Sequence, residues 1–218
     1  PLPTSSVSLP PIKTTLKDTT TRVTLYPITA GPSSLPPSLL HYLHEQFSLE
    51  IQNGCTYPME EAMGFDLYCS YWFGTFAVIA VLDWVEGEEV EKDELGLGLG
   101  LGLGLREGRD WEKACLGTFY VKPNYPGRCS HVCNGGFFTT PAARNRGVGN
   151  VMGAAYLEVA PKLGYKYSVF NLVFANNLAS VRIWEKLGFQ VIGRVPGAAR
   201  LANSAELVDA LIIGRELV

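Results

Sequence analysis

The stretch Gly135-Gly-Phe-Phe-Thr-Thr-Pro-Ala-Ala-Arg-Asn-Arg-Gly-Val-Gly149, followed by a helical run over 150–163, decides the fold of this chain. Proline cannot continue a central ladder, so a strand is expected to end at Pro141. Gly147 and Gly149 allow a tight turn and a close approach of a ligand to the backbone. The helix after the turn then begins with unpaired amide groups and the positive end of its dipole.

Positive side chains surround this turn. Arg144 and Arg146 stand beside the unpaired amides, so the stretch predicts a binding site for a phosphorylated ligand. A P-loop would require a Lys-Ser/Thr pair after the last glycine, and none follows Gly149. A Rossmann fingerprint would require a shorter glycine spacing and an acidic residue at the end of the strand predicted at 167–174.

A third interpretation of the turn rests on two motifs. Arg144-x-x-Gly147-x-Gly149 resembles the Arg/Gln-x-x-Gly-x-Gly/Ala loop of the GNAT N-acetyltransferases. Asn177-Leu-Ala-Ser-Val-Arg-Ile-Trp-Glu-Lys-Leu-Gly-Phe189 resembles a later helix of the same family, and the resemblance extends over about residues 71–218. It is most similar to the fungal enzymes that detoxify proline analogues such as azetidine-2-carboxylate, in the segments Tyr120–His131, Tyr165–Phe174 and Gly193–Arg200.

The resemblance implies an α/β (α+β) fold: a GNAT-like mixed, mostly antiparallel sheet with a central V-shaped split, flanked by helices. Paired glycines predict a bulge at 134–136 inside a strand over 130–140. In the family a bulge here splays this strand from the next one, and the pantetheine arm of acetyl-CoA lies in the gap. The other strands are expected at 22–28, 76–82, 114–121, 167–174, 190–194 and 207–215.

The chain is expected to form an extended N-terminal arm over 1–20 and a single acetyltransferase domain over 21–218. Apolar residues recur at three- and four-residue steps over 39–51, which predicts a helix, and 57–63 predicts a short second helix. The leucine–glycine repeat within 86–110 has the period of a strand. Its glycines make a strand costly, so a low-complexity loop insertion between two strands is favoured.

Acetyl-CoA is the cosubstrate that the resemblance implies, with its pyrophosphate on the glycine turn and its pantetheine arm along the splayed strand. Asn177 is expected near the pantetheine or the sulfur, and it is also a good N-cap for the helix that follows. The cofactor-binding residues expected on these grounds are Phe138, Thr139, Arg144, Asn145, Arg146, Gly147, Val148, Gly149, Asn150 and Asn177.

Two asparagines are expected to be catalytic. The fungal enzymes orient the acceptor with one asparagine on each splayed strand, and Asn134 and Asn171 match them. Asn171 interrupts an apolar strand, so it either orients a substrate or is a satisfied core amide. Many family members place a tyrosine where this chain has Trp184, and that tyrosine protonates the departing thiolate. Indole is no useful acid, and Glu60 and Glu61 are candidates for a base by position only.

The run 66–73 is unusually aromatic. Core packing is one explanation of such a run. The alternative is a pocket wall for a small, partly apolar acceptor, formed by Tyr71, Trp72 and Phe73 together with Phe138.

The composition of the chain limits which classes of binding partner are expected. A formal net charge of −3 argues against a nucleic-acid-binding surface, and no apolar run approaches the length of a membrane span. Five unpatterned cysteines suit reduced thiols and a cytoplasmic protein, while a mitochondrial location and a homodimer both stay open. The run Cys129-Ser-His131-Val-Cys133 lacks a fourth ligand at a recognisable spacing, so no metal site is expected.

These features predict an acetyl-CoA-dependent N-acetyltransferase of a small amino or imino acid, with proline analogues as the favoured acceptors. Another small amine, such as a polyamine or an antibiotic, is the alternative acceptor, although a polyamine would need an acidic cleft. A catalytically silent acyl-CoA-binding module is the alternative from a different class.

Overall fold

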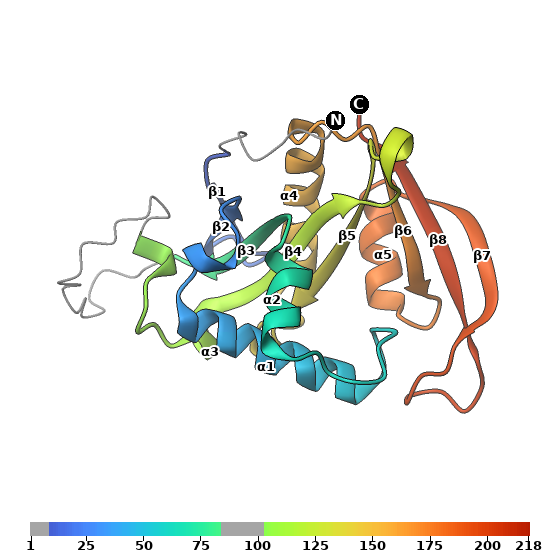
Figure 1. Cartoon of the computed structure of the whole chain (residues 1–218), viewed down its shortest axis with the longest axis horizontal. Helices are drawn as coiled ribbons and strands as arrows, with labels where there is room; N and C mark the ends of the chain where they lie inside the picture. Colours follow the sequence, from blue (N-terminus) through green and yellow to red (C-terminus); the bar gives the residue numbers. More distant parts are fainter. Residues whose placement is uncertain (1–8, 84–102) are drawn as a thin grey trace.

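One long sheet forms the centre of the molecule (Figure 1). The computed structural model describes residues 9–83 and 103–218, and within these ranges eight strands follow the order β1-β2-β3-β4-β5-β6-β8-β7. Every neighbouring pair is antiparallel except β5 and β6, which run parallel. The strands are β1 (Ile12–Thr15), β2 (Arg22–Ile28), β3 (Phe76–Leu82), β4 (Cys115–Pro123), β5 (Val132–Thr139), β6 (Tyr167–Phe174), β7 (Gln190–Ala199) and β8 (Val208–Glu216).

Helices cover both faces of this sheet, α1 and α2 on one side and α4 and α5 on the other (Figure 1). The first of them ends at Gly54, whose left-handed φ of 64° lets the chain turn away from the helix axis. A short helix, α3, leads directly into β4. The helices are α1 (Pro37–Asn53), α2 (Phe65–Phe73), α3 (Trp111–Ala114), α4 (Val148–Lys162) and α5 (Leu178–Lys186).

The sheet separates two apolar cores. Along β3, Val78 and Ala80 belong to the core under α4 and α5, whereas Ala77 and Ile79 belong to the core under α1 and α2. Side chains alternate between the faces of a strand, so a strand covered on both faces is apolar at every position. The run of β3, Phe-Ala-Val-Ile-Ala-Val-Leu, has this composition.

The mixed, mostly antiparallel sheet expected from the sequence is confirmed, and so are the two closing strands. Part of the predicted N-terminal arm belongs to the sheet, because Ile12–Thr15 pairs with β2 as an edge strand.

The short helix predicted at 57–63 is wrong. This segment has no helical residues, and the second helix is α2, which starts at Phe65 within the aromatic run. Two tertiary hydrogen bonds hold the segment instead. The Tyr57 hydroxyl donates to the Phe137 carbonyl at 2.7 Å, and the His44 ring bonds the Met63 carbonyl at 2.7 Å.

A V-shaped split opens between β5 and β6. The two strands pair only at Val132↔Tyr167 and Cys133↔Ser168, and they diverge beyond these pairs. The hydroxyl of Tyr156, from α4, lies 2.7 Å from the Ser168 hydroxyl and 3.1 Å from the Cys133 sulfur. One buried phenol therefore joins both strands at the last pair before they separate.

The bulge predicted at 134–136 is wrong. The register of β4 on β5 is unbroken from Gly117↔Thr139 to Pro123↔Cys133. The glycines have a packing role, because a Cβ at Gly135 would meet the Tyr156 ring and a Cβ at Gly136 would meet the Tyr120 ring. The irregularity at the split lies on the other strand, where the register of β6 on β8 shifts between Phe170 and Val173.

The predicted loop over 86–110 lies mostly outside the described residues. Its last residues are packed against the domain: Leu105 is buried, and the Arg109 guanidinium donates to the carbonyls of Leu82 and Gly104.

Replacing Tyr156 with Phe removes the hydroxyl that joins β5 and β6. We expect Tyr156→Phe to lower the free energy of unfolding by about 1–2 kcal/mol, since it deletes two buried hydrogen bonds and leaves Ser168 and Cys133 without this partner. Urea unfolding followed by circular dichroism measures the change. Tyr165→Phe is the control, because no described residue bonds its hydroxyl; equal stability of Tyr156→Phe and the parent would show that the phenol does not hold the split.

Candidate active site

A glycine turn joins β5 to α4 and presents free amide groups. Asn145 and Gly147 take left-handed conformations, with φ of 63° and 86°, and α4 starts at Val148. The N–H groups of residues 145–149 have no hydrogen-bond acceptor among the described residues. The N–H of Asn150 is the first that turns inward, to the Gly147 carbonyl at 3.1 Å. Unpaired amides and the positive end of a helix dipole are suited to an anion.

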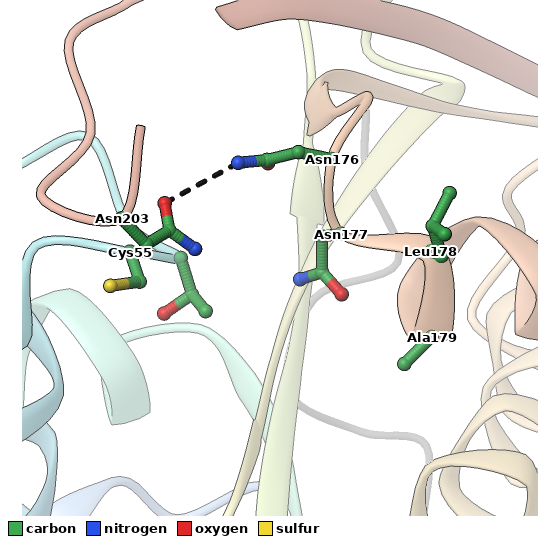
Figure 2. Close-up of a pocket in the computed structure, with 7 residues that line it drawn as sticks. Cys55, Asn176, Asn177, Leu178, Ala179 and Asn203 are labelled. Carbon is green, nitrogen blue, oxygen red and sulfur yellow. Dashed lines mark hydrogen bonds between the residues drawn. The ribbon is translucent and has the colours of Figure 1, made fainter. Parts of the chain in front are cut away.

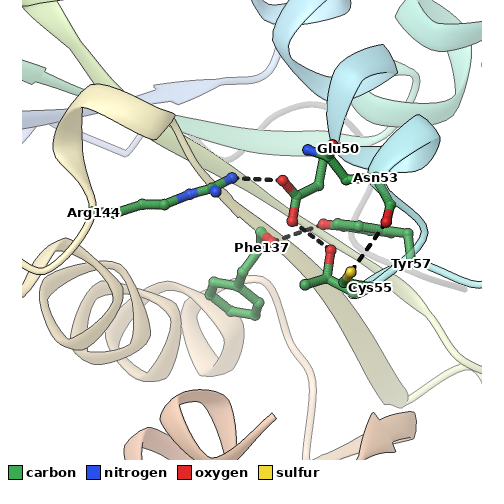
Figure 3. Close-up of polar contacts among 7 residues, drawn as sticks. Glu50, Asn53, Cys55, Tyr57, Phe137 and Arg144 are labelled. Carbon is green, nitrogen blue, oxygen red and sulfur yellow. Dashed lines mark hydrogen bonds and ion pairs between the residues drawn. The ribbon is translucent and has the colours of Figure 1, made fainter. Parts of the chain in front are cut away.

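The two arginines of the turn differ. Arg144 places Nη2 2.5 Å from Oε2 of Glu50, on α1, and the other carboxylate oxygen of Glu50 accepts from the Thr56 hydroxyl (Figure 3). Arg146 is exposed, and no carboxylate in the described ranges pairs with it. The sequence gives no sign of the link to Glu50. Arg144 therefore ties the turn to α1, whereas Arg146 keeps its full charge for a ligand.

Beyond its last pair with β6, the edge of β5 faces the split. The carbonyl of Phe138 points at Gly117 of β4, and the N–H of Thr140 bonds the Leu116 carbonyl. Backbone groups of successive residues point to opposite sides of a strand, so Phe137 and Thr139 direct theirs into the gap. The backbone of Phe138, which was expected to bind the cofactor, therefore faces β4, whereas the backbone of Thr139 faces the split.

Trp184 closes the gap on the α4/α5 face of the sheet. Its ring is 6% exposed and packs 4.7 Å from the ring of Phe137 and 4.6 Å from that of Phe170, measured between centroids. Its indole N–H donates to the Ser180 hydroxyl at 3.1 Å. This residue is part of the core that keeps the split strands apart.

Both expected catalytic asparagines lie where the strands separate. Asn134 is half-buried, directly after the last β5/β6 pair, and its side chain has no hydrogen-bond partner among the described residues. Asn171 is exposed at the register shift of β6, so the alternative of a core amide is wrong. Its Nδ2 donates to Oδ1 of Asn124 at 2.6 Å, and the reverse bond is 3.3 Å long.

The aromatic run is mostly core. Trp72 and Phe73 are fully buried and Phe138 is 3% exposed, so these three residues do not form a pocket wall. Trp72 donates its indole N–H to the Thr118 hydroxyl at 3.0 Å. Tyr71 is only half-buried, and its hydroxyl lies 3.0 Å from that of Tyr120. Of the expected wall, Tyr71 alone reaches the surface.

An open pocket of about 360 Å³ lies beside the N-terminus of α5 (Figure 2). The side chain of Asn177 turns toward it and accepts from the Ser180 N–H at 3.1 Å, which confirms the expected N-cap. Asn176 donates to Asn203 at 3.3 Å across the pocket, and Cys55 lies beside Asn203. The sequence does not indicate that Cys55 and Asn203 line one pocket, because their loops are far apart in the chain and meet only in the folded protein.

Two kinds of feature are absent from the described residues. No group of three or more His, Cys, Asp and Glu side chains is arranged to hold a metal ion. No helix in these ranges has the length and apolar character needed to cross a membrane.

The fold and the glycine turn are accompanied by similarity to a known protein family. Residues 105–189 match the acetyltransferase (GNAT) family. The chain is 42% identical over 174 residues to the N-acetyltransferase aca1 of Schizosaccharomyces pombe, a match that covers 80% of this chain and 78% of that protein. The chain therefore belongs to the GNAT acetyltransferase family.

Solved structures share the fold. A GCN5-related N-acetyltransferase from Kribbella flavida superposes with a TM-score of 0.66 at 23% identity, over 88% of this chain and 97% of that one. A GNAT phosphinothricin acetyltransferase from Sinorhizobium meliloti, solved with acetyl-CoA, gives a TM-score of 0.62 at 15% identity, over 89% of this chain and 88% of that one.

The chain is an N-acetyltransferase of the GNAT type, and acetyl-CoA is its cosubstrate. Its own geometry fits that molecule: unpaired amides at 145–149 suit a diphosphate, and the open edge of β5 suits an arm that carries amide groups. The side chain of Val148 is buried, so only its backbone N–H is available to a ligand.

Arg144 can bind the ligand, hold Glu50 in a salt bridge, or do both, and two variants separate these roles. We expect Arg144→Met in a Glu50→Gln background to bind acetyl-CoA about 10-fold more weakly than Glu50→Gln alone, as for a lost charge-assisted hydrogen bond. Calorimetric titration gives the dissociation constants. Equal affinity of the two proteins would show that Arg144 serves only Glu50. Arg146→Met is the companion variant, since its side chain has no such structural partner.

Proposed function

We propose that this enzyme acetylates the amino or imino nitrogen of a small amino acid, with proline analogues such as azetidine-2-carboxylate as the favoured acceptors. The observation that carries the proposal is the group of three amides, Asn134 and the Asn124–Asn171 pair, at the point where β5 and β6 separate. An amide side chain both donates and accepts, so it can orient an acid group and an amine. Phosphinothricin, the substrate in the name of one similar structure, is itself an amino acid.

The chain contributes positioning and polar stabilisation. Acetyl-CoA brings the acetyl group as a thioester. The N–H groups of Phe137 and Thr139 at the open edge are donors suited to a carbonyl oxygen that gains negative charge during the reaction. The asparagines hold the acceptor nitrogen in one orientation, which removes much of the entropic cost of the reaction.

Among the described residues, no side chain stands out as an acid or a base. Trp184 is committed to Ser180, and Glu50 is paired with Arg144. Glu60 and Glu61 are exposed on the segment before α2, and neither bonds another described residue. We therefore assign the transfer of the amine proton to water that reaches the open split.

A release assay for free CoA tests the proposal. The purified protein is incubated with acetyl-CoA and a panel of acceptors: azetidine-2-carboxylate, L-proline, phosphinothricin, glycine and spermidine. We expect the imino acids to give the highest kcat/KM of the panel. Preference for spermidine would support the alternative of a polyamine acceptor, and binding of acetyl-CoA without turnover of any acceptor would support a silent acyl-CoA-binding module.

Replacing Asn171 separates acceptor orientation from cofactor binding. We expect Asn171→Ala to lower kcat on azetidine-2-carboxylate on the order of 100-fold, since it removes an orienting group and the partner of Asn124. The dissociation constant of acetyl-CoA should stay unchanged by calorimetry. Asn53→Ala is the control, because that exposed side chain bonds no described residue. Normal turnover by Asn171→Ala on every imino acid would refute the assignment.

The pH profile tests for an enzymatic acid that titrates between neutral and mildly basic pH. Burial raises the pKa of Tyr57 well above its ordinary value and, with the neighbouring Tyr71, also raises that of Tyr120, so both phenols keep their protons through neutral and mildly basic pH. Only loss of the acceptor's amine proton should then affect kcat. We expect kcat to rise with pH and to reach a plateau. A bell-shaped profile of kcat would reveal an essential acid on the enzyme.

A further inference from the structure

A half-buried ammonium group lies beside the split without a counter-ion. Lys122, near the end of β4, places Nζ 4.2 Å from the ring centroid of Tyr71 and 4.3 Å from that of Tyr120. None of the carboxylates in the described ranges lies within ion-pair distance of it. Cation–π contacts fix the position of the charge, but they do not neutralise it.

The two tyrosine rings that contact Lys122 are themselves held in place. The hydroxyls of Tyr71 and Tyr120 lie 3.0 Å apart, and their rings meet edge to face with centroids 5.6 Å apart. Tyr120 also packs edge to face on the fully buried Trp72. Burial lowers the pKa of Lys122, because the protonated form loses part of its solvation there.

Lys122 lies on the same face of the sheet as the asparagines. It is the direct cross-strand partner of Asn134, and the Cβ atoms of such a pair lie about 5 Å apart on one face. The contact with Tyr71 of α2 shows that this is the face covered by α1 and α2 (Figure 1). Asn124, two residues further along the chain, bonds Asn171 across the split.

We infer that Lys122 binds the carboxylate of the acceptor and so makes the enzyme selective for amino and imino acids over amines that lack an acid group. This inference rests on the proposed function and names the group that would recognise the acid. A carboxylate supplies the counter-ion that the described chain does not, and charge-assisted hydrogen bonds of this kind are among the strongest polar contacts. The same positive charge would repel a polyamine.

Matched acceptors isolate this contact. We would measure kcat/KM for azetidine-2-carboxylate and for azetidine-2-carboxamide, which lacks the charge, with the parent, Lys122→Met and Lys166→Met. Met keeps most of the side-chain length without the charge, and exposed Lys166 is the control. We expect Lys122→Met to lose about 100-fold on the acid and nothing on the carboxamide, as for a lost hydrogen bond between charged groups. An equal loss on both acceptors, or no loss on the acid, would overturn the inference.

A binding measurement separates this inference from the proposed function. If the parent protein acetylates neither acceptor, the proposed function fails, and lysine ammonium resonances in an ¹⁵N NMR spectrum then decide the role of Lys122. With CoA present, we expect L-proline to shift the Lys122 resonance and L-prolinamide to leave it unchanged. A resonance that responds to neither ligand, or to both alike, would contradict carboxylate binding. Thermal melts of Lys122→Met confirm that the compared proteins are folded.

Discussion

Only two residue pairs join β5 to β6, and the geometry of the site depends on where that pairing stops. The Tyr156 hydroxyl fixes the last pair, Cys133 and Ser168, from the side of α4. Beyond it, the packing of Phe137, Phe170 and Trp184 fills one face of the split and keeps the strands apart. No described strand pairs with the edge of β5 beyond this point, so its N–H groups can pair with a ligand without any rearrangement of the sheet, although the Phe137 carbonyl already accepts from the Tyr57 hydroxyl.

The two faces of the split differ in chemistry. Aromatic rings close the α4/α5 face, whereas amides and an ammonium group surround the split on the α1/α2 face. The glycine turn proposed to bind the diphosphate stands at the far end of β5, and the salt bridge from Arg144 to Glu50 connects that turn to α1. The cofactor can thus bind along the edge of β5 while the acceptor binds on the α1/α2 face of the split. We therefore expect different residues to control the affinity for each.

Much of the fold could be predicted, because the decisive signals are local. The glycine turn, the apolar run of β3 and the end of β5 before Pro141 follow from backbone chemistry at single positions. The errors came from tertiary contacts. Glycines 135 and 136 suggested a bulge, but they make room for the rings of Tyr156 and Tyr120. Residues 57–63 have a helix-like pattern, but the bond from Tyr57 to Phe137 holds them in another conformation.

The residues proposed for the site came only partly from the sequence. Motifs identified the turn and both asparagines, but no pattern could pair Arg144 with Glu50, 94 residues earlier. Lys122 and Asn124 lie inside the segment most similar to the fungal enzymes, yet their roles became visible only through Tyr71 of α2 and Asn171 of β6. Whether a side chain faces a pocket or the core, as for Trp72, depends on which helix covers it.

We propose that the open edge of β5 holds the cofactor while the α1/α2 face of the split holds the acceptor. A crystal structure of the protein with CoA and azetidine-2-carboxylate tests it most directly. We predict pantetheine amide groups paired with the Phe137 N–H and with the backbone of Thr139, and the ring nitrogen of the acceptor beside Asn134 and Asn171. Pantetheine bound away from β5, or an acceptor in contact with neither asparagine, would contradict it.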